Sequence, residues 1–177
     1  EDKLALKSSQ IAKLCDRHFG IGADGLIRIV PSSKLAAGRE CLEVEPNATW
    51  FMDYYNADGS SAEMCGNGTR VFTRYLTERV LELGDGETLS IGTRDGVKDI
   101  QRNMAGFAVN MGRWRLEGDH TVSAASLDVA RPGLGISIGN PHVVVALASD
   151  EELTNLALHS APVIEPRLES GANVEFV

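Results

Sequence analysis

The sequence has 177 residues, of which 43% are hydrophobic, and it carries a formal net charge of -8. A chain of this length and composition can bury a core in one large domain or in two small ones. The negative charge argues against a nucleic-acid or anionic-membrane surface, because both need a clustered basic field.

The number and spacing of the cysteines limit the cellular compartment and the kinds of metal site that we expect. Cys15, Cys41 and Cys65 are an odd number, are widely spaced, and form no CxxC or Cys/His pattern typical of a metal site. Unpaired cysteines favour a reducing, cytoplasmic setting. No apolar run approaches the ~20 residues of a membrane span, and the first residues carry no secretory signal.

The first part of the chain predicts several strands around one strong helix. Residues 8–17 favour a short helix, and 26–30 and 50–55 favour strands. Residues 32–47 show no clear period and predict a loop that could include a short strand. Residues 66–80 have apolar side chains at spacings of three and four, which is the helical period. Short strands are predicted at 88–91, 97–101 and 107–111.

The second part begins after a polar stretch at 112–131, which predicts irregular structure. Strands are expected at 134–138 and 143–148, and the sequence SDEE at 149–152 predicts a capped helix that continues to about residue 158. Residues 173–177 favour another strand. We therefore expect a second lobe that begins in this chain and is not completed by it.

Residues 20–25, GIGADG, match the GxGxxG fingerprint of dinucleotide-binding proteins. That fingerprint needs a strand before the glycines and a helix after them. Here the predicted helix comes first and the strand second. The motif therefore predicts a turn built from glycines, and no dinucleotide site.

Cys65 stands directly before the predicted helix, followed by Gly66, Asn67 and Gly68. A helix N-terminus stabilises a thiolate placed there, and its free N–H groups can bind a carboxylate. The alternative is that Cys65 is a small buried apolar residue and that the glycines only form a tight turn.

Polar residues at three other turns are weaker candidates. His142 follows a Gly-Asn-Pro turn between two predicted strands, where it could exchange protons near neutral pH or serve a structural role. Asn56 and Asn173 could bind the amino and carboxylate groups of a ligand. Each could equally be an ordinary turn residue.

Five short blocks, in this order, resemble the diaminopimelate epimerase family. They are LCDRHFGIGADG at 14–25, NADGS at 56–60, MCGNG at 64–68, GNPH at 139–142 and NVE at 173–175. Each block alone is weak, and their order and spacing across nearly the whole chain are specific.

The resemblance implies an α+β fold of two pseudo-symmetric lobes. In this fold, an α/β roll, each lobe is a curved mixed or antiparallel sheet around a central helix. Residues 1–112 would form the first lobe, with its central helix from about 66 to 80. Residues 113–177 would form part of the second, incomplete lobe.

The resemblance also implies a cofactor-independent isomerase that interconverts LL- and meso-diaminopimelate, on the route to lysine and peptidoglycan. Such an enzyme needs no metal, acts on a small molecule, and is often a homodimer. Removing an α-proton without a Schiff base leaves a poorly stabilised carbanion, so the site needs a fixed base and strong electrostatic help. The family uses two cysteines, each at the head of a central helix.

The resemblance carries roles over to seven positions. Cys65 matches the first catalytic cysteine, and His142 matches a residue thought to tune the cysteine pair. The substrate-binding positions are Asn56, Gly66, Asn67, Asn140 and Asn173.

Three features depart from the family pattern. The second catalytic cysteine motif and the Glu-Arg pair before it are absent, as is an early segment with another substrate asparagine. Gly25 also stands where some members carry a substrate-contacting glutamine. We expect these 177 residues to be a fragment that is inactive by itself.

Three alternatives remain at this stage. A proline racemase-like isomerase of the same fold would carry Cys-Gly-His in place of Cys-Gly-Asn-Gly. A Cys/His hydrolase would use Cys65 and His142 through an acyl-enzyme. A ligand-binding remnant would bind diaminopimelate without exchanging its α-hydrogen.

Overall fold

The computed structural model describes residues 6–169 and 171–177. The chain divides into two compact units, Glu1–Met111 and Gly112–Val177. Each unit is built on one five-stranded mixed sheet. The fold class is α+β, as the sequence predicted.

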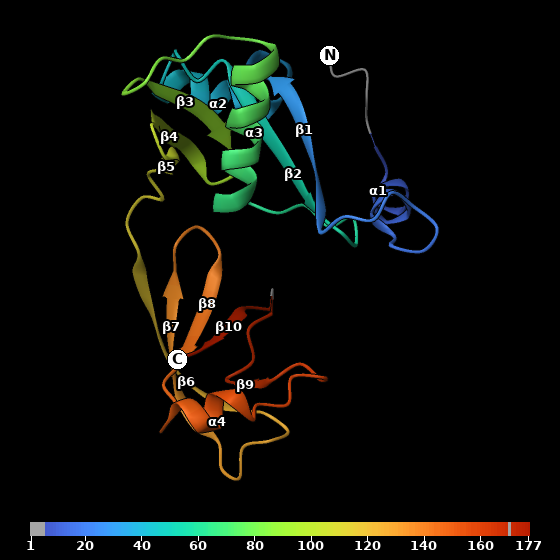
Figure 1. Ribbon diagram of the computed structural model, residues 1–177, viewed down its shortest axis with the longest axis vertical. Helices are drawn as coiled ribbons and strands as arrows, with labels where there is room; N and C mark the ends of the chain where they lie inside the picture. The colour runs from blue at the N-terminus through green and yellow to red at the C-terminus, as the bar shows by residue number, and fades with distance from the viewer. Residues whose placement is uncertain (1–5, 170) are drawn as a thin grey trace. The chain divides into compact units, whose positions relative to one another are not determined.

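The sheet of the first unit runs in chain order from β1 to β5 (Figure 1). Its strands are β1 (Gly25–Pro31), β2 (Trp50–Asn56), β3 (Thr88–Thr93), β4 (Gly96–Asn103) and β5 (Gly106–Val109). β2 and β3 are parallel, and the other neighbours are antiparallel. All five predicted strands of this part are confirmed.

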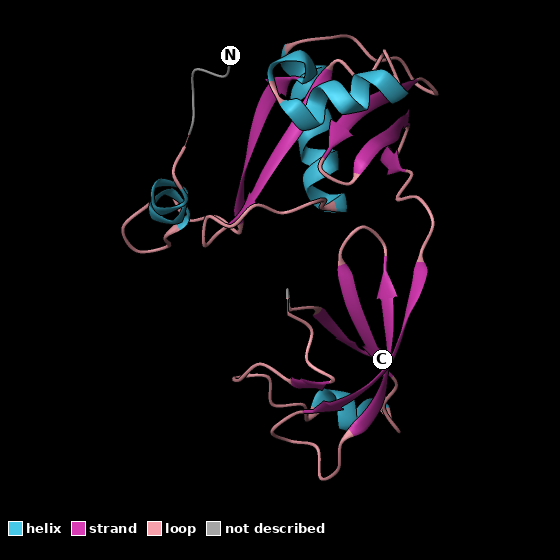
Figure 2. Ribbon diagram, turned by 180° about the vertical axis from the view of Figure 1, so that it is seen from behind, coloured by secondary structure: helices cyan, strands magenta, loops and turns pink. Residues whose placement is uncertain are grey.

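Helix α3 (Gly66–Arg79) packs on one face of this sheet and buries Phe72 and Leu76 against Met52, Ile91 and Ile100. It contacts β1 and β5, the two edge strands, so the sheet curves around it. Helix α2 (Ala36–Val44) covers the opposite face, as Figure 2 shows from behind. The helix predicted at 66–80 is thus confirmed.

The loop predicted at 32–47 is wrong. The structure has a 3-10 helix, η1 (Ser32–Lys34), followed by α2. Gly38 lies inside α2, and a Cβ there would stand 2.3 Å from the carbonyl oxygen of Ser32. Glycine permits this close packing, but it also lowers helix propensity and so hid the helix from the sequence pattern.

Helix α1 (Ser8–Cys15) precedes β1, and the glycine-rich segment 20–25 lies between them. The helix ends two residues earlier than predicted. The order helix, turn, strand confirms that the GxGxxG match is not a dinucleotide fingerprint.

The second unit has the strand order β10-β8-β7-β6-β9. Its strands are β6 (Arg115–Ser123), β7 (Arg131–Ser137), β8 (Pro141–Val145), β9 (Val163–Glu165) and β10 (Asn173–Phe176). β10 pairs with β8 in parallel, and the other pairs are antiparallel. Val122, Val143 and Val145 are fully buried and form the core of this unit.

Two predictions for this unit need correction. Residues 115–123, expected to be irregular, form β6; its early residues are exposed, and a register shift between Leu116 and Gly118 breaks the alternation that would have revealed it. Helix α4 (Asp150–Thr154) begins after Ser149 as predicted but ends four residues early. Within residues 112–169 and 171–177, α4 is the only α-helix, and no helix comparable to α3 accompanies the sheet.

No helix among the described residues has the length and hydropathy of a membrane span. The same residues contain no group of three or more His, Cys, Asp or Glu side chains that could hold a metal ion.

Candidate active site

Cys65 is the N-cap of α3. Its backbone is extended, with φ -146° and ψ 116°, and its Sγ accepts a hydrogen bond from the Gly68 N–H at 3.3 Å. The side chain is partly exposed. The sulfur therefore occupies the place of an N-cap oxygen, at the helix end whose first N–H groups have no intrahelical partner.

The glycines around Cys65 keep the space next to its sulfur open. A Cβ on Gly68 would lie 3.3 Å from Ile27 Cδ1 and 3.5 Å from the sulfur. A Cβ on Gly66 would lie 3.3 Å from the sulfur of Met111. Side chains at these positions would crowd the helix head, where glycine leaves the backbone accessible.

The N–H groups of Gly66 and Asn67 also belong to this helix head. The first main-chain bond of α3 runs from the Thr69 N–H to the Cys65 carbonyl at 2.8 Å, so both groups precede the intrahelical ladder. The side chain of Asn67 accepts a hydrogen bond from Arg70. The arrangement can bind a small anion such as a carboxylate.

Asn56 ends β2, the strand that runs beneath α3. Its Nδ2 donates to Ser60 Oγ at 3.1 Å, and its N–H donates to the Ser60 carbonyl at 2.9 Å. Gly59 completes this turn with φ +83°. Asn56 thus lies on an ordered turn, with its side chain exposed.

Tyr54 is two residues before Asn56 on β2, and residues two apart on a strand share one face. Its ring packs against the core beneath α3, and its hydroxyl neighbours the Cys65 thiol. Burial, with the charge and hydrogen bonding of Cys65, raises the pKa of Tyr54 above its ordinary value. The phenol therefore stays neutral beside the sulfur.

Gly25 lies against the same tyrosine. A Cβ at this position would stand 2.5 Å from the Tyr55 carbonyl and 2.7 Å from a ring carbon of Tyr54. No side chain fits at residue 25 without movement of the strand. The space that a longer residue would occupy is filled here by the Tyr54 ring.

The second unit holds a hydrogen-bonded cluster around His142. Its Nδ1 lies 2.7 Å from Glu175 Oε1, and its Nε2 lies 3.0 Å from Asn140 Oδ1. Both ring nitrogens face oxygen atoms, so a doubly protonated imidazole can donate to both. The ring is fixed in orientation from two sides.

The strand register explains this cluster. In the parallel pair of β8 and β10, Asn173 stands opposite His142, so Glu175 projects from the same face two residues further on. Asn173 Nδ2 donates to the Pro141 carbonyl at 3.5 Å. The structure thus brings Asn173 beside Asn140 and His142, which lie in a separate block of the sequence.

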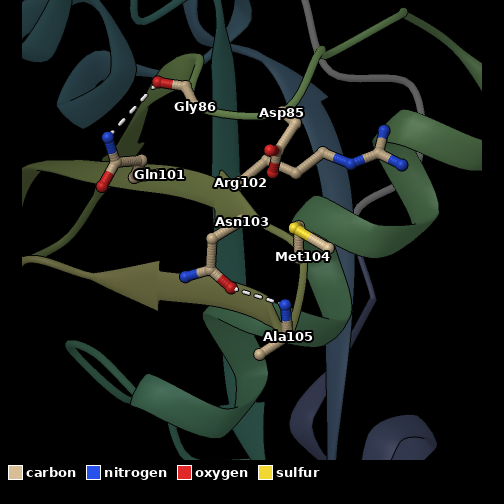
Figure 3. Close-up of a pocket in the computed structure, with 7 residues that line it drawn as sticks. All are labelled: Asp85, Gly86, Gln101, Arg102, Asn103, Met104 and Ala105. Carbon is tan, nitrogen blue, oxygen red and sulfur yellow. Dashed lines mark hydrogen bonds between the residues drawn. The ribbon is translucent and has the colours of Figure 1, made fainter.

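Two hollows of the first unit lie elsewhere. One, of about 480 Å³, is lined by Asp85, Gly86 and residues 101–105 (Figure 3). The other, of about 650 Å³, lies between α3 and the turn after β4. Neither is lined by a candidate site residue.

The comparison with known families identifies the family of this chain. Residues 1–117 match the model of the family described as diaminopimelate epimerase. The chain belongs to the diaminopimelate epimerase family. Cys65 and the head of α3 lie inside the matched residues, and the His142 cluster follows them.

Curated relatives extend the similarity over nearly the whole chain. The diaminopimelate epimerase of Corynebacterium aurimucosum is 40% identical over 97% of this chain and 64% of its own length. That of Streptomyces coelicolor is 40% identical over 100% of this chain and 60% of its own length. The chain therefore spans less than two thirds of these epimerases.

A solved structure is more distantly similar. The phenazine biosynthesis protein of the PhzF family from Bacillus anthracis has a TM-score of 0.41 and 18% sequence identity, over 71% of this chain and 51% of that one.

Two side chains that contact candidate site residues were not identified from the sequence. Tyr54 lies beside Cys65, and Glu175 holds His142. Both stand two residues from an asparagine already singled out, Asn56 and Asn173. The period of two along a strand was the signal that could have found them.

Proposed function

We propose that the protein interconverts LL- and meso-diaminopimelate without a cofactor, by proton transfer at the α-carbon between two cysteines. Cys65 is one of these acid/base groups. The observation that carries the proposal is the Cys65 sulfur at the N-cap of α3, hydrogen-bonded to the Gly68 N–H, in a chain of this family. The route to lysine and peptidoglycan precursors is the proposed context.

The head of α3 suits the reaction because negative charge develops on the substrate. When the α-proton leaves, charge spreads onto the adjoining carboxylate. The N–H groups of Gly66 and Asn67 are fixed donors in place before the reaction, so they need no reorganisation. We propose that they bind this carboxylate, and that Asn56 contacts the substrate nearby.

In the second unit we propose that Asn140 and Asn173 contact the substrate and that His142 tunes the cysteine pair. Glu175 and Asn140 hold the imidazole at 2.7 and 3.0 Å. With both ring nitrogens engaged inside its own unit, His142 is poorly placed to serve as the base of a hydrolase. This supports the epimerase over the Cys/His hydrolase.

The other two cysteines are poor candidates for the second acid/base. Cys15 is the last residue of α1 and Cys41 lies within α2, and both are buried. Burial raises the pKa of the Cys41 thiol and so disfavours its thiolate. We therefore propose that the second cysteine lies outside these 177 residues, and that they are inactive alone.

The three cysteines are free, which supports a reducing, cytoplasmic setting for the protein. Cell fractionation with an antibody against the protein tests this.

The proposed function is tested by α-hydrogen exchange. Full-length protein is incubated with LL-diaminopimelate in deuterated water, and loss of the α-proton signal is followed by NMR. We expect exchange in the wild type, and a fall of about 10³-fold in Cys65→Ser, because a positioned acid/base contributes that order of rate. Cys41→Ser is the matched control and retains activity.

Three results would contradict the proposal. One is exchange at the wild-type rate in Cys65→Ser. A second is tight binding of diaminopimelate without exchange in the wild type, which would identify a ligand-binding protein. Activity that disappears with removal of a carbonyl cofactor by hydroxylamine would also exclude the cofactor-free mechanism.

A further inference from the structure

A buried ionic network lies on the face of β2 that points away from α3. Asp53 is only 2% exposed, and Arg28 Nη1 stands 3.0 Å from its Oδ2. Arg94 pairs with the other carboxylate oxygen, and the Tyr55 hydroxyl donates to Oδ2 at 3.0 Å. One buried carboxylate thus receives two guanidinium groups, more than its neutralisation requires.

Arg94 has a second set of partners that an ion pair does not need. Its Nη1 donates to the Tyr54 carbonyl at 2.7 Å and to the Ala62 carbonyl at 3.1 Å. The guanidinium also stacks 4.9 Å from the centre of the Tyr55 ring. The planar fork of arginine can make all these contacts at once, which a lysine ammonium cannot do.

These contacts fasten the loop between β2 and α3 onto β2. The Ala62 N–H donates to the Tyr54 carbonyl at 3.1 Å, and Ser61 pairs with Tyr55 as an isolated bridge. These bonds already form a junction between β2 and the loop, and Arg94 adds further hydrogen bonds to it. Beyond it, only Glu63 and Met64 separate Ala62 from Cys65.

The junction restrains the position of Cys65 and of a side chain next to its thiol. On one side, the hydrogen bonds at Ala62 fix the backbone that leads into α3, and so restrain the position of Cys65. On the other side, the fixed carbonyl belongs to Tyr54, whose hydroxyl neighbours the Cys65 sulfur. Small shifts at such a site are costly, because proton transfer needs the base within hydrogen-bond reach.

We propose that Arg94 is a positioning residue for Cys65, acting through the carbonyls of Tyr54 and Ala62 and held in place by Asp53. The effect of Arg94 on turnover rests on the proposed function, whereas its effect on the position of the Cys65 sulfur does not. Arg94 touches neither the reacting atoms nor the helix head itself.

The test compares three variants of the full-length protein. Arg94→Met removes all the contacts, and Arg94→Lys keeps a charge for Asp53 but not the fork. Arg102→Met is the matched control, because Arg102 Nη1 also donates to a loop carbonyl, that of Leu83, at 2.5 Å, and lies on β4, the strand that follows Arg94 (Figure 3). Cys65 alkylation by iodoacetamide is measured against pH by peptide mass, with kcat, KM and thermal unfolding alongside.

We expect Arg94→Met to move the midpoint of the alkylation profile upward by about half a pH unit, because the sulfur leaves the helix N–H groups. For α-hydrogen exchange, kcat falls about tenfold and KM changes much less, because geometry and not binding is lost. Arg94→Lys recovers thermal stability but neither the midpoint nor kcat. Arg102→Met leaves both at wild-type values.

The proposal is overturned if Arg94→Met or Arg94→Lys loses stability while the alkylation midpoint and kcat stay unchanged. That result would make Arg94 a stabilising ion pair only. If Arg94→Met does not fold, Arg94→Lys decides on the same readouts. If the wild type exchanges no α-hydrogen, the epimerase function fails, and the alkylation profile still decides the role of Arg94.

Discussion

The Nδ1 atom of His142 lies 2.7 Å from Oε1 of Glu175, a residue 33 positions later in the chain, across two parallel strands. A carboxylate in this position fixes the ring orientation and favours a proton on Nδ1. The other oxygen of Glu175 is buried and has no hydrogen-bond partner among the described residues. The carboxylate is therefore directed at the imidazole and little else.

We expect Glu175→Gln to lower kcat for α-hydrogen exchange by about tenfold, because an amide can keep the contact but not the charge, and loss of such an outer partner typically costs this much. Steady-state exchange kinetics on the full-length protein measure it, with nitrogen NMR of His142 to follow the ring proton. Glu169→Gln, an exposed change in the same unit, is the control. Wild-type kcat in Glu175→Gln would show that His142 acts without its carboxylate.

Because Cys65 is both the N-cap of α3 and the proposed acid/base, its substitutions should affect stability and activity differently. Serine is a preferred N-cap, so Cys65→Ser should keep the free energy of unfolding near that of the wild type, whereas Cys65→Ala should lose about 1 kcal/mol with the Gly68 hydrogen bond. In both variants the rate of α-hydrogen exchange should fall by about 10³-fold or more. Urea unfolding followed by circular dichroism measures the difference, and equal stability of the two variants would rule out the cap.

Tyr54 should make stability depend on pH in alkali. Its pKa is raised in the folded protein by burial and by Cys65, so its contribution to stability is complete below the ordinary tyrosine pKa near 10 and is lost as pH rises through the folded value. We expect Tyr54→Phe to lose stability less steeply than the wild type above pH ~10. Tyr75→Phe, at a side chain 52% exposed, should follow the wild type. Equal slopes for all three proteins would contradict the prediction.

His120 on β6 should be replaceable with a gain in stability. It is 7% exposed, neither ring nitrogen has a hydrogen-bond partner among the described residues, and its Nε2 lies against the bare Cα of Gly135. A buried polar group without a partner is costly, so His120→Leu should raise the free energy of unfolding by about 1 kcal/mol. His159→Leu, at an exposed site, should change it little. Destabilisation by His120→Leu would mean that the imidazole has a role in the unit.

The sequence determined much of the first unit because its signals are local. The helical period of residues 66–80 and the turn signals around the strands depend on nearby residues, and the structure confirms α3 and five strands. The capping position of Cys65 followed from the same local pattern. Helix α2 and strand β6 were not predicted from the sequence. Gly38 and the exposed start of β6 serve packing and register, which local propensity does not report.

The partners of the site residues were decided only by the tertiary structure. Glu175 meets His142 through a parallel strand pairing, and Arg94, in the turn after β3, meets Ala62 more than 30 residues earlier in the chain. Such contacts depend on which strands and turns become neighbours and in which register, and the sequence pattern of each strand is compatible with several pairings. The residue types that carry the chemistry could thus be named from the sequence, while the groups that hold them in place required the fold.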